Sequence, residues 1–278
     1  MSSALISDTV KISDDLTIYY ETAGSGPKTV LFIPGWGMST QVFEKQLTHF
    51  AQSNTYRAIT YDPRGQGRTT KTRDGHYYDQ RGADLKAFID ALGLRNITLV
   101  GWSYGVLDQF SYISQFGIDQ LDAAVIVDGT AKTVGDDNSI EWVWLRKDDA
   151  DGSRQWYTMT PLVDRGQFNR AFAEWMLEDA TEDNVFWLSE ISNQTDNTTM
   201  AILNETASYA DYSQALEALN GKLPLLVIVR EEWSDVVRNH VKEKLSCAKV
   251  SVFGKHMMFW EHSERFNSEL SAFLDSLD

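Results

Sequence analysis

Six short runs of apolar and β-branched residues, separated by longer amphipathic stretches, constrain the fold of this chain more than any other feature. Runs of this density are typical of strands buried on both faces of a parallel sheet, and the stretches between them are typical of crossover helices. Helical spacing is clear in 79–92 and 262–277, and residues 8–22 fit an opening hairpin. The pattern predicts an α/β fold, with strand runs at 29–33, 56–61, 97–100, 123–127, 225–229 and 249–253.

Length and charge narrow the class of protein. The 278 residues suit one α/β domain with an inserted segment better than two independent domains. The formal net charge is −15, and no basic stripe exists to neutralise phosphates, so we exclude nucleic acid as a partner. No apolar run approaches the ~18 residues of a membrane span, and no signal peptide is evident at the start. We therefore expect a cytoplasmic protein without a membrane span, whose oligomeric state the sequence leaves open.

One interval breaks the alternation of strands and helices. Residues 130–222 contain no strand run but several helical stretches and five of the nine tryptophans. We predict that this interval is a helical cap inserted after the sixth strand of the main sheet, and that residues 1–129 and 223–278 form the core. For most of these indoles we expect core packing. The five are Trp142, Trp144, Trp156, Trp175 and Trp187.

The pentapeptide Gly-Trp-Ser-Tyr-Gly at residues 101–105 joins a strand run directly to an amphipathic stretch. A serine exposed on a tight strand-to-helix turn has strained backbone angles, so its neighbours two positions away must be small. The helix that begins beyond the turn supplies free N–H groups and the positive end of a helix dipole. The arrangement predicts that Ser103 is a nucleophile.

In this context the pentapeptide resembles the nucleophile elbow of the α/β-hydrolase superfamily, and the resemblance extends over essentially the whole chain. It implies a mostly parallel, doubly wound sheet of about eight strands. The loop Pro-Gly-Trp-Gly at 34–37 stands where that family places its oxyanion loop, with proline in place of the usual histidine. By this resemblance the backbone N–H groups of Trp36 and Tyr104 are the oxyanion donors, each contributing about 3 kcal/mol to catalysis.

The stretch 61–68 resembles the family's Asp-x-Arg-Gly-x-Gly loop after the fourth strand. We interpret this loop as structural. Its Arg64 is expected to bond local backbone rather than substrate.

A serine hydroxyl is weakly nucleophilic until a neighbouring base takes its proton, and five histidines are available. His49 and His240 lie in helical stretches, His76 lies in a polar loop, and His262 starts the final helix. Only His256 directly follows the last strand run, in a Gly-Lys-His sequence. Hydrolases of the resembled superfamily carry their catalytic histidine on that loop in a Gly-x-His pattern. We therefore predict that His256 is the base.

The third member of the triad has two candidates. The superfamily most often places its acid just after the strand at 225–229. Counting residues from the end of that strand, however, puts a tryptophan at the position where the aspartate is expected. Asp235 comes two residues later and reaches the histidine only if the loop bends. Asp128, immediately after the strand at 123–127, occupies the other known location. Glu231 and Glu232 are disfavoured, because their register points them away from the histidine loop.

These residues favour a serine hydrolase that cleaves a carboxylic ester or lactone of an apolar or aromatic small molecule through an acyl-enzyme on Ser103. No metal-ligand spacing is present, so we predict neither a metal nor a cofactor. The single cysteine, Cys247, excludes an intramolecular disulfide and is expected to be a buried, inert thiol.

Three other functions remain open. The loop at 34–37 and Asp128 also resemble cofactor-free dioxygenases that cleave hydroxy-oxoquinoline rings, although those carry a histidine before the serine, where this chain has Trp102. Carbon–carbon-bond hydrolases and lyases use the same fold. A non-catalytic ligand-binding protein is the third, but such proteins usually lose a member of the triad, and here serine, histidine and candidate acids all remain.

Overall fold

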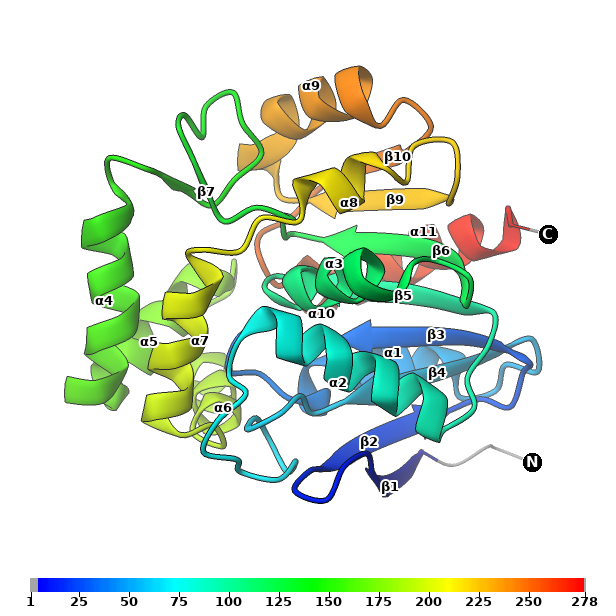
Figure 1. Cartoon of the computed structure of the whole chain (residues 1–278), viewed down its shortest axis with the longest axis horizontal. Helices are drawn as coiled ribbons and strands as arrows, with labels where there is room; N and C mark the ends of the chain where they lie inside the picture. The colour runs from blue at the N-terminus through cyan, green and yellow to red at the C-terminus, as the bar shows by residue number, and fades with distance from the viewer. Residues whose placement is uncertain (1–4, 278) are drawn as a thin grey trace.

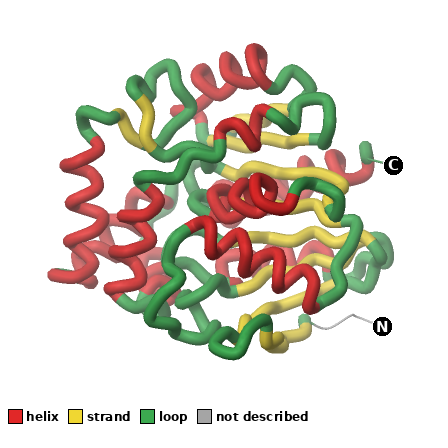
Figure 2. Tube along the Cα trace, in the orientation of Figure 1, coloured by secondary structure: helices red, strands yellow, loops and turns green. Residues whose placement is uncertain are grey.

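A computed structural model describes residues 5–277 of the chain. Within these residues the main sheet has eight strands in the order β1-β2-β4-β3-β5-β6-β9-β10 (Figures 1 and 2). The first three in that order pair antiparallel, and all later pairs are parallel. The predicted α/β fold is thus confirmed. The strands are β1 Ile6–Lys11, β2 Thr17–Ala23, β3 Lys28–Ile33, β4 Tyr56–Tyr61, β5 Ile97–Trp102, β6 Leu121–Val127, β9 Leu225–Val229 and β10 Lys249–Val252.

Helices cover both faces of this sheet. Figure 1 shows α2 and α3 in front of the strands and α11 behind them. Helices α2 and α11 match the two stretches in which helical spacing was clear. The helices outside the insertion are η1 Thr40–Phe43, α1 Glu44–Phe50, α2 Tyr78–Ala91, α3 Gly105–Phe116, η2 Glu231–Trp233, α9 Ser234–Lys244, α10 Met258–Glu261 and α11 Ser263–Asp275.

The central strands contribute to two core layers, because adjacent residues of a strand point to opposite faces. In β3, Phe32 packs in the cluster that contains Phe266 of α11. Its neighbour Leu31 packs in the other cluster, with Phe88 of α2. All four side chains are fully buried. Burial on both sides explains why these strands read as continuous apolar runs rather than as alternating patterns.

The segment between β6 and β9, residues 130–222, is mainly helical and is called the inserted segment below. Figure 1 shows α4 to α7 standing together at the left, beside the ends toward which β3 and β6 point. The segment also contains two short strands, β7 and β8, that pair with each other. Each is only two residues long, too short to show a periodic pattern, so this pair was not predicted. The segment contains β7 Val134–Gly135, β8 Leu145–Arg146, α4 Ala150–Val163, α5 Arg165–Met176, α6 Glu182–Ser192, α7 Asn197–Ala207 and α8 Ser213–Glu217.

The tryptophans of the inserted segment differ in their surroundings. Trp142 is buried as expected, whereas Trp156 is 40% exposed. Trp144 and Trp175 are half-buried and line the cavity described below. The expectation of core packing therefore holds for part of the set only, because some of these indoles face a cavity or solvent.

The expectation of a buried thiol is wrong, because Cys247 is exposed in a turn between α9 and β10, and connecting turns run over the surface.

Within residues 5–277 no helix is both long and apolar enough to cross a bilayer.

Two buried ion pairs attach α2 to its surroundings. Arg64 forms two hydrogen bonds to Asp84, at 2.7 and 2.8 Å, so it bonds a helix side chain rather than the local backbone that we expected. Arg81 bonds Asp108 of α3 in the same way, at 2.7 and 2.6 Å. The second pair links the two helices that cover one face of the sheet.

We expect Asp108→Asn to lower the free energy of unfolding by about 3–5 kcal/mol, because it leaves Arg81 buried without a counter-charge. Urea unfolding followed by tryptophan fluorescence measures the loss. The matched control is Glu269→Gln, which removes an exposed pair with Arg265 on α11 and should change stability by less than about 1 kcal/mol. Equal losses in the two variants would contradict a structural role for the buried pair.

Candidate active site

Ser103 lies on the turn between β5 and α3 in a left-handed backbone conformation, with φ of +56°. Non-glycine residues rarely adopt this region, and doing so stores strain at the turn. The flanking glycines are sterically required. A Cβ on Gly101 would lie 2.9 Å from the carbonyl oxygen of Gly105, and a Cβ on Gly105 would lie 2.4 Å from that of Ile33. The local sequence therefore defines a tight turn that places Ser103 directly after the carboxyl end of β5.

The loop after β3 packs directly against this serine. A Cβ on Gly35 would lie 2.9 Å from the Cβ of Ser103 and 3.4 Å from its Oγ. Within residues 5–277, the backbone N–H groups of Trp36 and Tyr104 have no hydrogen-bond acceptor. Two unpaired donors thus flank the serine, which is the arrangement expected of the predicted oxyanion donors.

The side-chain amide of Gln66 holds the loop after β3 in place. Its side-chain amide donates to the carbonyl oxygens of Gly35 and Met38, at 3.1 and 2.7 Å. Its carbonyl oxygen accepts from Gly37 N at 3.3 Å and from Arg81 at 3.0 Å. The loop around Gln66 was predicted to be structural, but the role of this side chain was not predicted, because a glutamine between two glycines carries no spacing signal.

His256, on the loop after β10, contacts Asp128 at the end of β6. The distance from Nδ1 to Oδ2 is 2.5 Å, and both side chains are fully buried. Trp102 fixes the loop further, since its indole N–H donates to the carbonyl oxygen of His256 at 3.0 Å. Asp128 itself has φ of +39°. Asp235 is exposed in the first turn of α9, so the structure brings Asp128 to the histidine and leaves Asp235 outside.

Arg230, the residue directly after β9, is a second partner of the buried carboxylate. Its backbone N–H donates to Asp128 Oδ1 at 3.0 Å, and its Nη1 donates to Oδ2 at 2.6 Å. The acid was sought among the residues that follow Arg230, and a cation at this position was not considered. The available signal was a charged residue at the carboxyl end of a buried strand, where parallel sheets place their functional groups.

The charges at this centre favour a carboxylate and a neutral imidazole. Burial alone would raise the pKa of Asp128, but the hydrogen bond with His256 and the charge of Arg230 more than offset it and hold the pKa below its usual 3.8. Burial lowers the pKa of His256 below its usual 6.5; Asp128 opposes this shift, whereas Arg230 and Lys255 add to it. A carboxylate only accepts hydrogen bonds, so Nδ1 carries the proton and Nε2 is left as a base.

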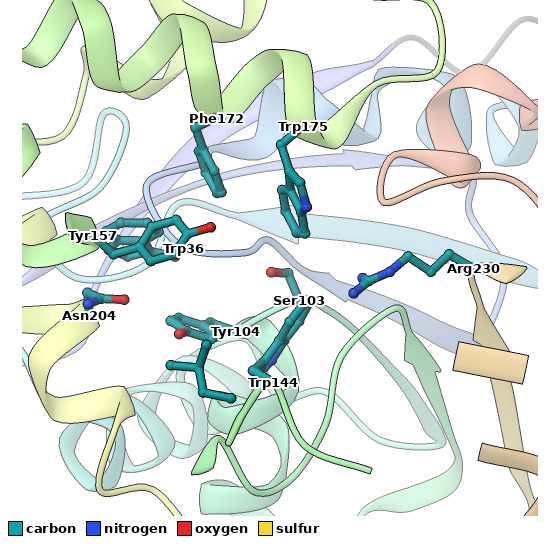
Figure 3. A pocket seen from close by; sticks show the side chains of 10 residues that line it. Trp36, Ser103, Tyr104, Trp144, Tyr157, Phe172, Trp175, Asn204 and Arg230 are labelled. Atoms are coloured by element: carbon teal, nitrogen blue, oxygen red, sulfur yellow. The ribbon is translucent and has the colours of Figure 1, made fainter. Parts of the chain in front are cut away.

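A cavity of about 210 Å³ opens over the serine (Figure 3). Trp175 and Trp144 line this cavity together with Ser103, and their rings lie 4.7 and 5.6 Å from that of His256, so the imidazole packs against part of the cavity wall. Within residues 5–277 no group of histidines, cysteines or carboxylates is arranged to hold a metal ion. The lining residues are Trp36, Ser103, Tyr104, Trp144, Leu145, Tyr157, Phe172, Trp175, Asn204 and Arg230.

Known proteins share both the sequence pattern and the fold. Residues 28–262 match the family model of the alpha/beta hydrolase fold. A non-heme haloperoxidase of Rhodococcus erythropolis is 35% identical over 118 residues, which are 42% of this chain and 42% of that protein. The match therefore spans less than half of the length of that curated relative.

Two solved structures superpose over nearly the whole chain. A bromoperoxidase from Bacillus anthracis has a TM-score of 0.85 at 26% identity, and covers 97% of this chain and 100% of its own. An esterase from Exiguobacterium antarcticum has a TM-score of 0.85 at 21% identity, with the same coverage. With the family model matching most of its length, the chain belongs to the α/β-hydrolase family.

We expect His256 to titrate below pH 6.5, because burial and the nearby Arg230 disfavour its charged form. Histidine-selective ¹⁵N NMR across pH 4–9 measures the midpoint, and His256→Gln assigns the resonance. Since the folded pKa is depressed, the stability due to this group is complete above the unfolded value of about 6.5 and is lost as the pH falls through the folded pKa. A midpoint at or above 6.5 would contradict the stated electrostatics.

Proposed function

We propose that this enzyme is a serine hydrolase, which cleaves a carboxylic ester or lactone of a small apolar or aromatic molecule through an acyl-enzyme on Ser103. The observation that carries the proposal is the buried contact between His256 and Asp128 beside a strained serine in an aromatic cavity. Relatives that are named as esterases and haloperoxidases support a reaction of this kind.

In the first step Ser103 Oγ attacks the carbonyl carbon of the substrate, and His256 Nε2 takes the hydroxyl proton. Asp128 accepts from Nδ1–H and stabilises the imidazolium that forms. The negative charge on the former carbonyl oxygen meets the free N–H groups of Trp36 and Tyr104. The tetrahedral intermediate then expels the alcohol, which receives its proton from His256, and an ester to Ser103 remains.

In the second step a water molecule takes the place of the alcohol. His256 removes a proton from that water, and the resulting hydroxide attacks the acyl carbon. The carbon–oxygen bond to Ser103 breaks, the serine oxygen recovers its proton from His256, and the carboxylic acid leaves. A lactone follows the same steps, with the alcohol and the acid in one product molecule.

We further propose that the inserted segment acts as a cap over this chemistry. Tyr157, Phe172 and Trp175 come from its helices and form the wall opposite the serine turn (Figure 3). Aromatic walls displace water from the site, which strengthens the electrostatic interactions within it. They also favour an apolar or aromatic substrate over a polar one.

A fluorophosphonate probe tests the nucleophile, and a panel of short and long acyl esters together with lactones tests the reaction. We expect a covalent adduct on Ser103, no adduct in Ser103→Ala, and turnover of at least part of the panel. The adduct is located by mass spectrometry of the digested protein. Absence of the adduct from the folded wild-type enzyme would sink the proposal. Oxygen uptake with a hydroxy-oxoquinoline, without ester turnover, would instead favour the cofactor-free dioxygenase reaction.

The triad acid is tested by a matched pair of substitutions. Asp128→Asn should lower kcat by about 10⁴-fold, because the amide no longer holds the histidine in the required tautomer. Asp235→Asn changes an exposed residue on α9 and should leave kcat within about twofold, as is usual for surface substitutions. Steady-state kinetics on one ester from the panel give both values. Similar, mild losses in the two variants would mean that this triad is incorrect.

A further inference from the structure

Arg230 is a buried cation in the wall of the cavity. The residue is only 7% exposed, yet it lines the same cavity as Ser103. Figure 3 shows its side chain extending from the right toward Ser103, with the guanidinium at the near end. Arginines are rarely buried unless they are paired, so the partners of this guanidinium show what it is placed to bind.

The hydrogen bonds of the guanidinium use only part of its donors. Nη1 donates to Asp128, and Nε donates to Glu232 at 3.1 Å. Within residues 5–277, Nη2 donates to no acceptor. Guanidinium donors form a rigid planar fork that matches the two oxygens of a carboxylate. Nε and Nη1 are engaged, so Nη2 is the donor that remains available to a ligand in the cavity.

Three tryptophans hold the plane of the guanidinium. The centre of the group lies 4.2 Å from the ring of Trp233, 5.2 Å from that of Trp144 and 5.5 Å from that of Trp175. Contacts at these distances are cation–π interactions, which orient a cation and exclude water from it. Because Trp144 and Trp175 also line the cavity, the fork is preorganised at the cavity wall rather than free to swing into solvent.

The buried counter-charge of Arg230 is shared. Asp128 is bonded to both Arg230 and His256, and the side chain of Glu232 is 75% exposed, so water screens its charge. When His256 accepts the serine proton, an equal negative charge forms on the substrate oxygen, so this step leaves the net charge of the site unchanged. A substrate carboxylate beside Nη2 would give Arg230 a second counter-charge within the cavity.

We propose that Arg230 binds a carboxylate group of the substrate, so that the site selects esters or lactones that carry a negative charge. This inference rests on the proposed acyl-enzyme function of Ser103. The aromatic walls take the apolar part of such a molecule, and the free Nη2 of the guanidinium donates to its carboxylate. The arginine is then a specificity-determining residue as well as a partner of Asp128.

The test compares two isosteric substrates, 4-acetoxybenzoate and 4-acetoxybenzamide, with each rate normalised to hydrolysis by hydroxide. We expect wild-type kcat/KM to favour the carboxylate by about tenfold or more, the scale of one charge-assisted hydrogen bond. Arg230→Met should bring the ratio of the two kcat/KM values to about one, and Arg230→Lys, which keeps the charge without the fork, should give an intermediate ratio.

The ratio separates substrate binding from the bonds that Arg230 makes to Asp128, because loss of those bonds slows both substrates equally. Lys255→Met is the matched control. It removes another cation next to His256, but the Lys255 side chain bonds Glu174 and Leu177 outside the cavity lining, so the ratio should stay at its wild-type value. An unchanged ratio in Arg230→Met, or a wild-type ratio near one, would overturn the inference.

A binding measurement on the wild-type enzyme gives a second readout that needs no folded variant. Benzoate should slow fluorophosphonate labelling of Ser103, and benzamide at the same concentration should slow it less. Equal protection by the two compounds would count against a carboxylate site. Failure of the inference is distinguishable from failure of the proposed function: in the first case Ser103 is labelled and esters turn over without preference, and in the second there is no labelling and no ester turnover.

Discussion

The rest of the active centre depends on the buried carboxylate of Asp128. It accepts hydrogen bonds from the imidazole of His256 and from both the backbone and the side chain of Arg230. One side chain thus joins the end of β6 to the loops that follow β9 and β10. A buried carboxylate without hydrogen-bond partners has a large free-energy cost, so each of these bonds stabilises the folded arrangement. The result is a histidine in a fixed orientation, whose Nε2 is the proposed proton acceptor.

The serine side of the site has separate support. The tight turn leaves no room for a Cβ at Gly101 or Gly105, and the loop at Gly35 packs against it. Gln66 clamps that loop and is itself held by Arg81, whose charge is balanced by Asp108 between α2 and α3. The predicted oxyanion loop is therefore supported from the helices on one face of the sheet, and the predicted base is supported from the ends of the later strands. The two halves meet at the carboxyl edge, as open parallel sheets require.

Much of this was predictable from the sequence because the strong signals are local. Continuous apolar runs gave the strands, and the two glycines around Ser103 defined the turn. The position of His256 after the last run gave a candidate base. The choice between Asp128 and Asp235 was not predictable, because it depends on how three loops converge, and sequence spacing does not encode that distance.

Arg230 and Gln66 were missed for a related physical reason. A single arginine or glutamine in a loop has many surface roles, and only its partners distinguish a site residue from a solvated one. The exposure of Cys247 and the mixed surroundings of the tryptophans illustrate the same limit. The residue type indicates how strongly a side chain favours burial, whereas the surrounding turn or cavity determines whether the side chain is buried.

The clamp at Gln66 has a consequence for how such an enzyme can diversify. Most of the cavity wall belongs to the inserted segment, which makes no part of the Gln66–Arg81–Asp108 chain. Exchanging wall residues of the inserted segment leaves these three side chains unchanged, although Trp36 of the loop also packs against Phe172 of that segment. Most of the wall and the side chains that support the loop are thus carried by separate pieces of the chain. An architecture of this kind can change the shape of its cavity without rebuilding the Gln66–Arg81–Asp108 support.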